Sequence, residues 1–170
     1  MGMESLRELY VDELKDLYNA EQQLTKALPK MAEASSHPDL KNAFREHLRQ
    51  TEGQIARLEQ IFEQLGRGPR GKHCKGMAGL IEEGEEMIKE GGDADTLDAA
   101  LICAAQKVEH YEMAGYGTVR TWAYLLGEAE ACRLLQQTLD EEGQADKKLT
   151  ALAESHVNQE ATAAETRAAA

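Results

Sequence analysis

Apolar residues recur at alternating intervals of three and four over four long stretches of the chain, at about residues 5–34, 39–65, 95–126 and 128–155. This spacing places them along one face of an α-helix. Helix-breaking residues separate the stretches: Ser-Ser-His-Pro-Asp at 35–39, Gly-Arg-Gly-Pro-Arg-Gly at 66–71, and Gly127. We therefore predict an all-α protein with four long helices, the second of which opens at Pro38 or Asp39.

The connections predict how these helices are arranged. The first two and the last two are joined by links so short that each pair must be antiparallel. Residues 67–94 form a longer crossover with a short amphipathic segment around Met77 and Ile81, which predicts one extra helix. Two antiparallel hairpins joined by a long crossover form a ferritin-like four-helix bundle, here residues 1–155. The tail 156–170 lacks an apolar stripe and is expected to be frayed or disordered, or to form a helical extension without core contacts.

Acidic residues interrupt the apolar stripes of these helices. Glu21 replaces an apolar residue in the first helix, Glu109 and Glu112 do so in the third, and Glu142 does so in the fourth. A buried carboxylate without a partner is costly, and a shared cation is the natural compensation. Glu52 of the second helix and Asp146 of the fourth are added to these four. The predicted metal ligands are Glu21, Glu52, Glu109, Glu112, Glu142 and Asp146.

The depth of these residues in the bundle supports the prediction. Glu21 lies 15 residues before Ser36, and Glu52 follows Ser36 at about the same distance. Glu112 and Glu142 lie 15 residues before and after Gly127. Because an α-helix rises about 1.5 Å per residue, each pair should lie at one level of its hairpin.

An oxygen-rich ligand set favours Fe or Mn over Zn. We expect two Fe ions per chain, with Mn as the alternative. Dinuclear carboxylate bundles usually supply a Glu-x-x-His pair from each of two helices, but Ile55 and Ala145 stand where those histidines would be. His47 and Tyr116 are predicted to lie beside the metal ligands, with direct ligation by His47 as the less favoured alternative.

Composition excludes several other classes of protein. The net charge of −12 over 170 residues disfavours direct binding to nucleic acids. No run of 18 apolar residues is present and the first residues, MGMESLRELY, are polar, so we expect a cytoplasmic protein with no membrane association. Cys74, Cys103 and Cys132 are odd in number and lack CxxC spacing, which indicates reduced thiols to which the sequence assigns no role.

Five segments carry a resemblance to a known family: LYNAEQQL, FREHLRQTEGQIARLEQIF, KHCKGMAGLIEEG, VEHYEMAGYGTVRTWA and LLQQTLDEEGQADKKL. Together they span nearly the whole bundle, and the chain resembles the YciF-like bacterial stress-response proteins of the ferritin-like superfamily. The resemblance implies a rubrerythrin-like bundle, commonly dimeric, with a dinuclear metal site. It maps that site onto the same six acidic residues.

Three functions remain open at this point. The first is an oxidoreductase whose metal pair consumes hydrogen peroxide or dioxygen; it would need an external reductant, because no rubredoxin-like CxxC domain is present. The second is iron handling, as a ferroxidase or a store. The third is a non-catalytic stress or scaffold protein whose metal is structural or absent.

We also expect a homodimer formed through the first two helices, with the crossover segment as the alternative contact. Five of their apolar residues spread wider than one bundle seam requires: Leu6, Leu9, Leu40, Ile61 and Phe62.

Overall fold

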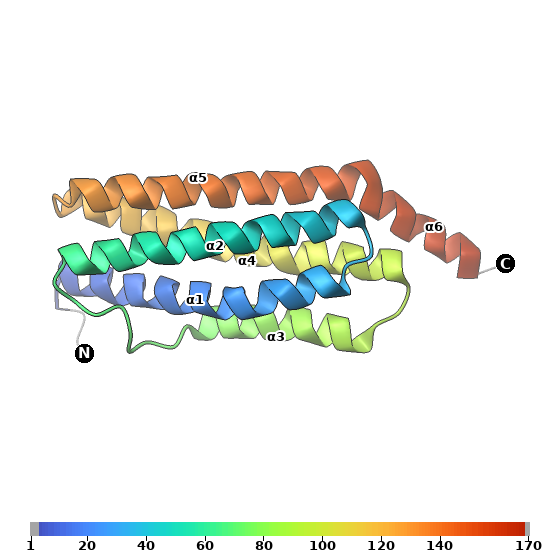
Figure 1. The fold of residues 1–170 in the computed structure, drawn as a ribbon, viewed down its shortest axis with the longest axis horizontal. Helices are drawn as coiled ribbons and strands as arrows, with labels where there is room; N and C mark the ends of the chain where they lie inside the picture. Colours follow the sequence, from blue (N-terminus) through green and yellow to red (C-terminus); the bar gives the residue numbers. More distant parts are fainter. Residues whose placement is uncertain (1–3, 169–170) are drawn as a thin grey trace.

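Helices account for nearly all of the computed structural model, which describes residues 4–168 and the side chains up to Ala164. The elements are α1 (Leu6–Ala34), α2 (Pro38–Gln64), α3 (Lys75–Glu90), α4 (Ala94–Leu125), α5 (Ala129–Leu152), a π-helical turn (Ala153–Val157) and α6 (Asn158–Ala168) (Figure 1). The prediction of an all-α chain is confirmed. No helix among the described residues combines the length and hydropathy needed to cross a membrane.

The helix ends follow from local chemistry. The Ser5 hydroxyl accepts a hydrogen bond from the Glu8 amide at 3.2 Å and thereby caps α1. Pro38 takes the first position of α2, where no backbone N–H is needed for the helix. Gly127 turns the chain between α4 and α5 with φ at 77°, a left-handed conformation that side chains with a Cβ disfavour.

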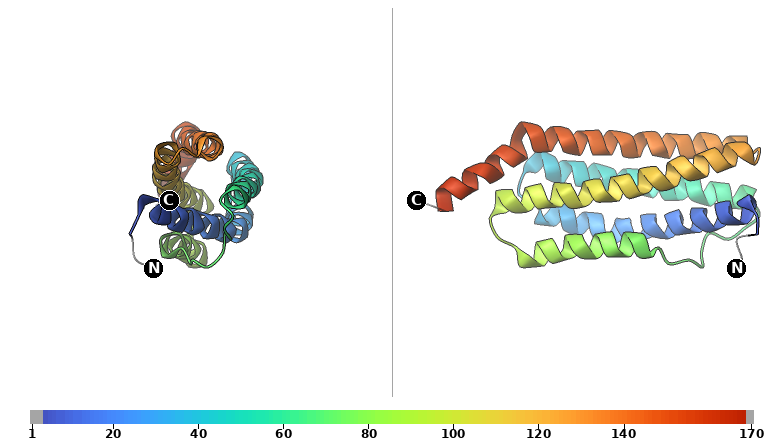
Figure 2. Two further views of the ribbon diagram at one scale, coloured as in Figure 1. Left: turned by 90° about the vertical axis from the view of Figure 1, so that its left-hand side faces the viewer. Right: turned by 180° about the vertical axis from the view of Figure 1, so that it is seen from behind.

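The four long helices form two antiparallel hairpins, α1 with α2 and α4 with α5, which share the most extensive packing in the molecule. The crossover carries the chain back along the bundle, so that α2 and α4 run in the same direction (Figure 1). Viewed end-on, α1 packs beside α4 and α2 beside α5, while α3 covers the outside of α1 and α4 (Figure 2). This is the predicted four-helix bundle with one short helix in its crossover.

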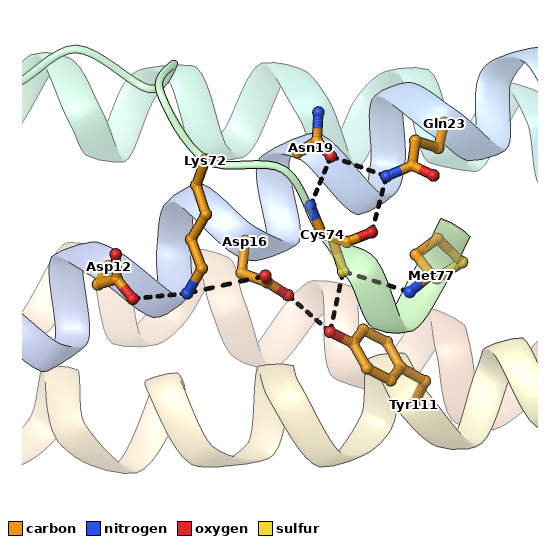
Figure 3. Close-up of polar contacts among 8 residues, drawn as sticks. All are labelled: Asp12, Asp16, Asn19, Gln23, Lys72, Cys74, Met77 and Tyr111. Carbon is orange, nitrogen blue, oxygen red and sulfur yellow. Dashed lines mark hydrogen bonds and ion pairs between the residues drawn. The ribbon is translucent and has the colours of Figure 1, made fainter. Parts of the chain in front are cut away.

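A set of polar side chains fastens the crossover to α1 and α4 (Figure 3). The Tyr111 hydroxyl donates to Asp16 Oδ2 at 2.6 Å and lies 3.0 Å from Cys74 Sγ. The same sulfur accepts from the Met77 amide at 3.4 Å and so caps α3. Gly76 allows this approach, because a Cβ there would lie 2.7 Å from the Tyr111 ring. Cys74 is therefore a buried anchor of the crossover.

The preceding loop residues join the same set. Lys72 Nζ lies 2.5 Å from Asp12 Oδ2 and 3.7 Å from Asp16 Oδ1. Asn19 Oδ1 accepts from the Cys74 amide at 2.8 Å, and the Cys74 carbonyl accepts from Gln23 Nε2 at 3.0 Å. We call this set the crossover network; its members are Asp12, Asp16, Asn19, Gln23, Lys72, Cys74, Met77 and Tyr111.

Burial makes the crossover network resistant to ionisation at its centre. It raises the pKa of the Tyr111 hydroxyl, which the neighbouring Asp16 carboxylate raises further. It also raises the pKa of the Cys74 thiol. Both groups therefore stay protonated near neutral pH and serve as hydrogen-bonding groups.

The structure corrects the prediction for the tail. Residues 156–168 are helical, while 169 and 170 lie outside the described residues. Leu149, Ala153 and Val157 follow one another at intervals of four, and the π-helical turn directs Val157 into the core, where its side chain is 1% exposed. Helix α6 then packs against α4, and Ala164 is buried. The apolar stripe thus continues past residue 155.

The structure also removes the apolar surface on which the predicted dimer was based. Leu40, Ile61 and Phe62 are all buried within the chain, and Phe62 packs edge-on against Tyr18 with ring centroids 6.4 Å apart. Leu9 is half-buried, and only Leu6 is an exposed member of the proposed surface. The wider apolar stripe serves the core of the monomer.

Candidate metal centre

A polar layer divides the hydrophobic core into two parts. One apolar cluster, which includes Leu28 and Leu149, lies toward the α1–α2 link. The other, which includes Leu14 and Leu135, lies toward the opposite end. Between them, each long helix contributes polar residues to buried positions: Glu21, His47, Thr51, Gln54, Glu109, Glu112, Thr138 and Glu142. Such a layer costs stability unless something compensates its charges.

Four of these side chains converge closely enough to bind one metal ion. Ligand atoms of His47, Glu109, Glu112 and Glu142 all lie within 4.8 Å of one another. His47 Nε2 is 3.2 Å from Glu109 Oε1 and 3.7 Å from Glu142 Oε2. Ligands on opposite sides of an ion at about 2.1 Å are about 4.2 Å apart, so only small side-chain rotations are needed.

Unsatisfied polar atoms are concentrated in this cluster. His47 Nε2 and both oxygens of Glu112 and Glu142 are buried without a hydrogen bond, as is one oxygen of Glu109 and one of Glu21. The contacts of His47 Nε2 with Glu109 and Glu142 lack hydrogen-bond geometry. Buried polar atoms are rarely left unpaired, and bound cations would compensate the group. The donor set of carboxylates and one imidazole fits Fe or Mn.

In the protein without a cation, burial favours the neutral form of three of these carboxyl groups. Burial raises the pKa of Glu21, Glu109 and Glu112 well above the usual range. Charge repulsion adds to this effect, chiefly from Glu142 for Glu21 and Glu109, and from Glu21 for Glu112. The influence of Glu142 and Glu112 on Glu21 shows that Glu21 lies beside the four converging side chains.

Two neighbouring side chains orient the cluster. Gln50 Oε1 lies 3.3 Å from His47 Nδ1, and because this oxygen can only accept, the contact places a proton on Nδ1 and turns Nε2 toward the cluster. The buried Tyr116 hydroxyl donates to Glu21 Oε1 at 2.5 Å. Tyr116 therefore lies where the sequence predicts it, beside the carboxylates. His47 belongs to the cluster itself.

Glu52 does not join the layer, contrary to the prediction. Its side chain is exposed, whereas Thr51, one residue earlier, is fully buried. Successive residues of a helix point about 100° apart, so a residue at the correct depth can still face solvent. On α2, His47 faces the cluster in place of Glu52.

Asp146 is also absent from the converging group. Its half-buried carboxylate lies 3.3 Å from His110 Nε2 and accepts from Gln106 Nε2 at 3.2 Å. Its charge still raises the pKa of Glu109, although less than burial and Glu142 do. Asp146 thus lies at the margin of the cluster and is engaged by α4.

The sequence contains a second signal for the contribution of α2. Phe44, His47, Thr51, Gln54 and Leu58 follow the three–four spacing of a buried stripe, and all five are buried. Reading the stripe through Leu48 and Ile55 instead selects half-buried residues. On α2, polar residues at buried stripe positions therefore mark the candidate site.

Known proteins share this architecture. The chain is 46% identical to Protein YciF of Escherichia coli (strain K12) over 162 residues, which cover 95% of this chain and 98% of that protein. The crystal structure of the E. coli stress protein YciF superposes with a TM-score of 0.88 over 92% of this chain and 99% of that one, also at 46% identity.

Two further solved structures are similar. YcfI from Rhodopseudomonas palustris has 44% sequence identity and a TM-score of 0.85, covering 87% of this chain and 94% of that one. A protein from Xanthomonas campestris pv. campestris, 20% identical, shares the fold with a TM-score of 0.74, covering 98% of this chain and all of that one. The sequence pattern of the family described as domain of unknown function DUF892 matches residues 5–162, and the chain belongs to this family.

Proposed function

We propose that the polar layer binds two iron or manganese ions and that the loaded protein reduces a peroxide or dioxygen as a bacterial stress-response oxidoreductase. The observation that supports this most directly is the group of seven unpartnered ligand atoms, which come from five side chains on four helices. Two ions fit the donor set better than one, because four carboxylates supply eight oxygens and carboxylates bridge metal pairs.

The five side chains have distinct parts in this proposal. His47, Glu109, Glu112 and Glu142 form the group that converges on one ion. Glu21, adjacent to Glu112, would complete the second position. Bound ions of this kind would supply a two-electron redox couple. Tyr116 holds Glu21 in place and keeps its own proton, because burial and the neighbouring carboxylates raise the pKa of its hydroxyl.

Reduction of hydrogen peroxide to two molecules of water consumes two electrons and two protons. Among the described residues, the three cysteines are far apart in sequence and none forms a disulfide bond. We therefore propose that a separate reductant protein supplies the electrons. The similarity to the stress protein YciF is consistent with such a role.

Anaerobic metal titration tests the proposal. The metal-free protein should bind two equivalents of Fe²⁺ per chain, and addition of stoichiometric peroxide should oxidise both without forming a mineral. Continued uptake of many Fe²⁺ ions per chain would indicate iron storage instead. Failure to bind Fe²⁺ or Mn²⁺ would leave a non-catalytic scaffold as the function.

The predicted homodimer and cytoplasmic location also remain proposals. With Leu40, Ile61 and Phe62 in the core, the dimer rests on the family resemblance. Light scattering at low micromolar concentration should give about twice the chain mass of 18.8 kDa. A mass near that of one chain would contradict the dimer.

A further inference from the structure

A cavity of about 110 Å³ lies between α2 and α5, next to the metal centre. Its walls are mainly apolar and come from all four long helices: Leu24 and Leu28 of α1, Phe44 of α2, Val108 of α4, and Ala145 and Leu149 of α5. Protein interiors are normally packed without spaces of this size. The cavity therefore requires an explanation.

The two ends of the cavity differ in polarity. His47 and Glu109, both members of the metal centre, form its inner end. Their side chains are 5% and 2% exposed, and His47 Nε2 has no hydrogen bond. At the outer end, exposed Glu46 and Lys148 form an ion pair that links α2 to α5. The cavity thus leads from the protein surface to the metal centre.

Small side chains keep this space open. Ala43, Ala105 and Ala145 line it from three different helices. Further along the same pair of helices, Arg57 closes the α2–α5 interface with two bonds to Glu141, at 2.6 and 2.7 Å. The opening is therefore confined to the segment beside His47 and Glu109.

The chemistry of the walls restricts the occupant. A buried water needs two to four polar partners, and the part of the cavity lined by Leu24, Leu28, Phe44, Val108 and Leu149 offers none, so this apolar part suits hydrocarbon better than water. An anion would be repelled by the neighbouring carboxylates. The volume is somewhat below that of the engineered cavity of about 150 Å³ that binds benzene. These features select a neutral molecule with a short branched or linear alkyl group.

We propose that this cavity binds a small neutral organic molecule whose oxygen-bearing end reaches His47 and Glu109. Resting on the proposed function, this makes a short-chain organic hydroperoxide the substrate class of the metal centre. Its reduction would break the O–O bond and give the alcohol and water, consuming two protons and two electrons from the external reductant. tert-Butanol is the corresponding redox-inert probe.

Titration of the metal-free protein with tert-butanol, followed by methyl NMR, tests binding directly. We expect saturable shifts of the Leu24, Leu28, Val108 and Leu149 methyl signals, with a dissociation constant of about millimolar or tighter. Ala145→Leu fills the cavity and should weaken binding at least about tenfold. Ala151→Leu, an exposed substitution on the same helix, is the matched control and should leave binding unchanged.

A second variant protects the test against a folding failure. If Ala145→Leu does not fold, Ala105→Val narrows the cavity from α4 and should also weaken tert-butanol binding. Absence of saturable shifts in the wild-type protein, or undiminished binding in the filled variants, would overturn the inference.

Cobalt(II) separates this inference from the proposed function. In the cobalt-loaded wild type, tert-butanol should change the visible absorption, whereas Ala145→Leu should bind cobalt equally well and show no such change. Cobalt binding without any effect of tert-butanol would overturn the cavity inference alone. tert-Butanol binding by a protein that takes up no cobalt would overturn the proposed function alone and leave the cavity as a ligand site.

Discussion

The crossover network, which is partly buried, and the metal centre, which is fully buried, both include side chains of α1 and α4, but they differ in how their polar atoms are satisfied. Asp16 and Tyr111 bond to each other, and no side-chain atom of the crossover network is buried without a partner. Glu21 and Glu112 lie nearby on the same two helices, and the metal centre they belong to has seven unpartnered atoms. Burial of polar groups therefore does not by itself indicate a ligand site. Several unpartnered ligand atoms gathered in one place do indicate such a site, whereas single unpartnered atoms such as the Tyr10 hydroxyl oxygen also occur elsewhere in the core.

Deleting two carboxylates should produce the largest effect in this comparison. The double variant Glu112→Ala and Glu142→Ala removes two of the four converging ligands and should abolish stoichiometric binding of Fe²⁺ or Co²⁺. Helical content should persist, because the change also relieves repulsion among buried charges. Isothermal titration calorimetry and circular dichroism measure the two outcomes. Retention of two metal equivalents would refute the assigned centre.

The metal-free protein should become more stable as the pH falls from 7 to 5. The pKa values of Glu21, Glu109 and Glu112 are raised in the folded state above the value of 4.5 in the unfolded chain. At pH values above 4.5, folding is therefore accompanied by the uptake of protons. The free energy of unfolding should rise by about 1.4 kcal/mol per pH unit for each proton taken up, and the gain should end near pH 4.5.

Urea unfolding at each pH provides the measurement. The double variant should show a smaller slope, since it lacks two of the crowded carboxyl groups. Loaded protein should show the opposite trend, because protons compete with the metal for the carboxylates. A steady loss of stability of the metal-free wild type over this range would contradict the clustering.

Removing the central hydroxyl of the crossover network should affect stability and leave metal binding intact. Tyr111→Phe removes the hydrogen-bond partner of Asp16 Oδ2 and of Cys74 Sγ, at a cost of about 1–3 kcal/mol in the free energy of unfolding. Chemical denaturation measures the cost, and calorimetry should find the wild-type affinity for Fe²⁺. A loss of metal affinity larger than about tenfold would mean that the two clusters are not independent.

The smallest effect is expected for Glu52→Gln. Because this side chain is exposed, its neutralisation should change metal affinity less than about twofold. Glu142→Gln makes the same chemical change inside the metal centre. It should weaken metal binding by more than the roughly 10–100-fold loss that is typical when a side chain hydrogen-bonded to a metal ligand is replaced. Equal losses in the two variants would restore Glu52 as a ligand and displace His47.

The sequence by itself determined the helices, their ends and the hairpins. These features depend on local interactions: backbone bonds within each helix, the Ser5 cap and the turn at Gly127. It also selected Glu21, Glu109, Glu112 and Glu142 for the interior, because they occupy positions on stripes that are otherwise mainly apolar.

Only the tertiary structure decided the remaining members of the site. Two faces of α2 fit the spacing of a buried stripe, one containing His47 and the other containing Leu48. Packing against the other helices buries the first face, so that His47 is buried and Glu52 is exposed. Asp146 could face the carboxylates, but His110 and Gln106 of α4 engage it at the margin. A rotation of one residue, about 100°, separates a ligand from a surface side chain, and that rotation is set by contacts between helices that are distant in the sequence.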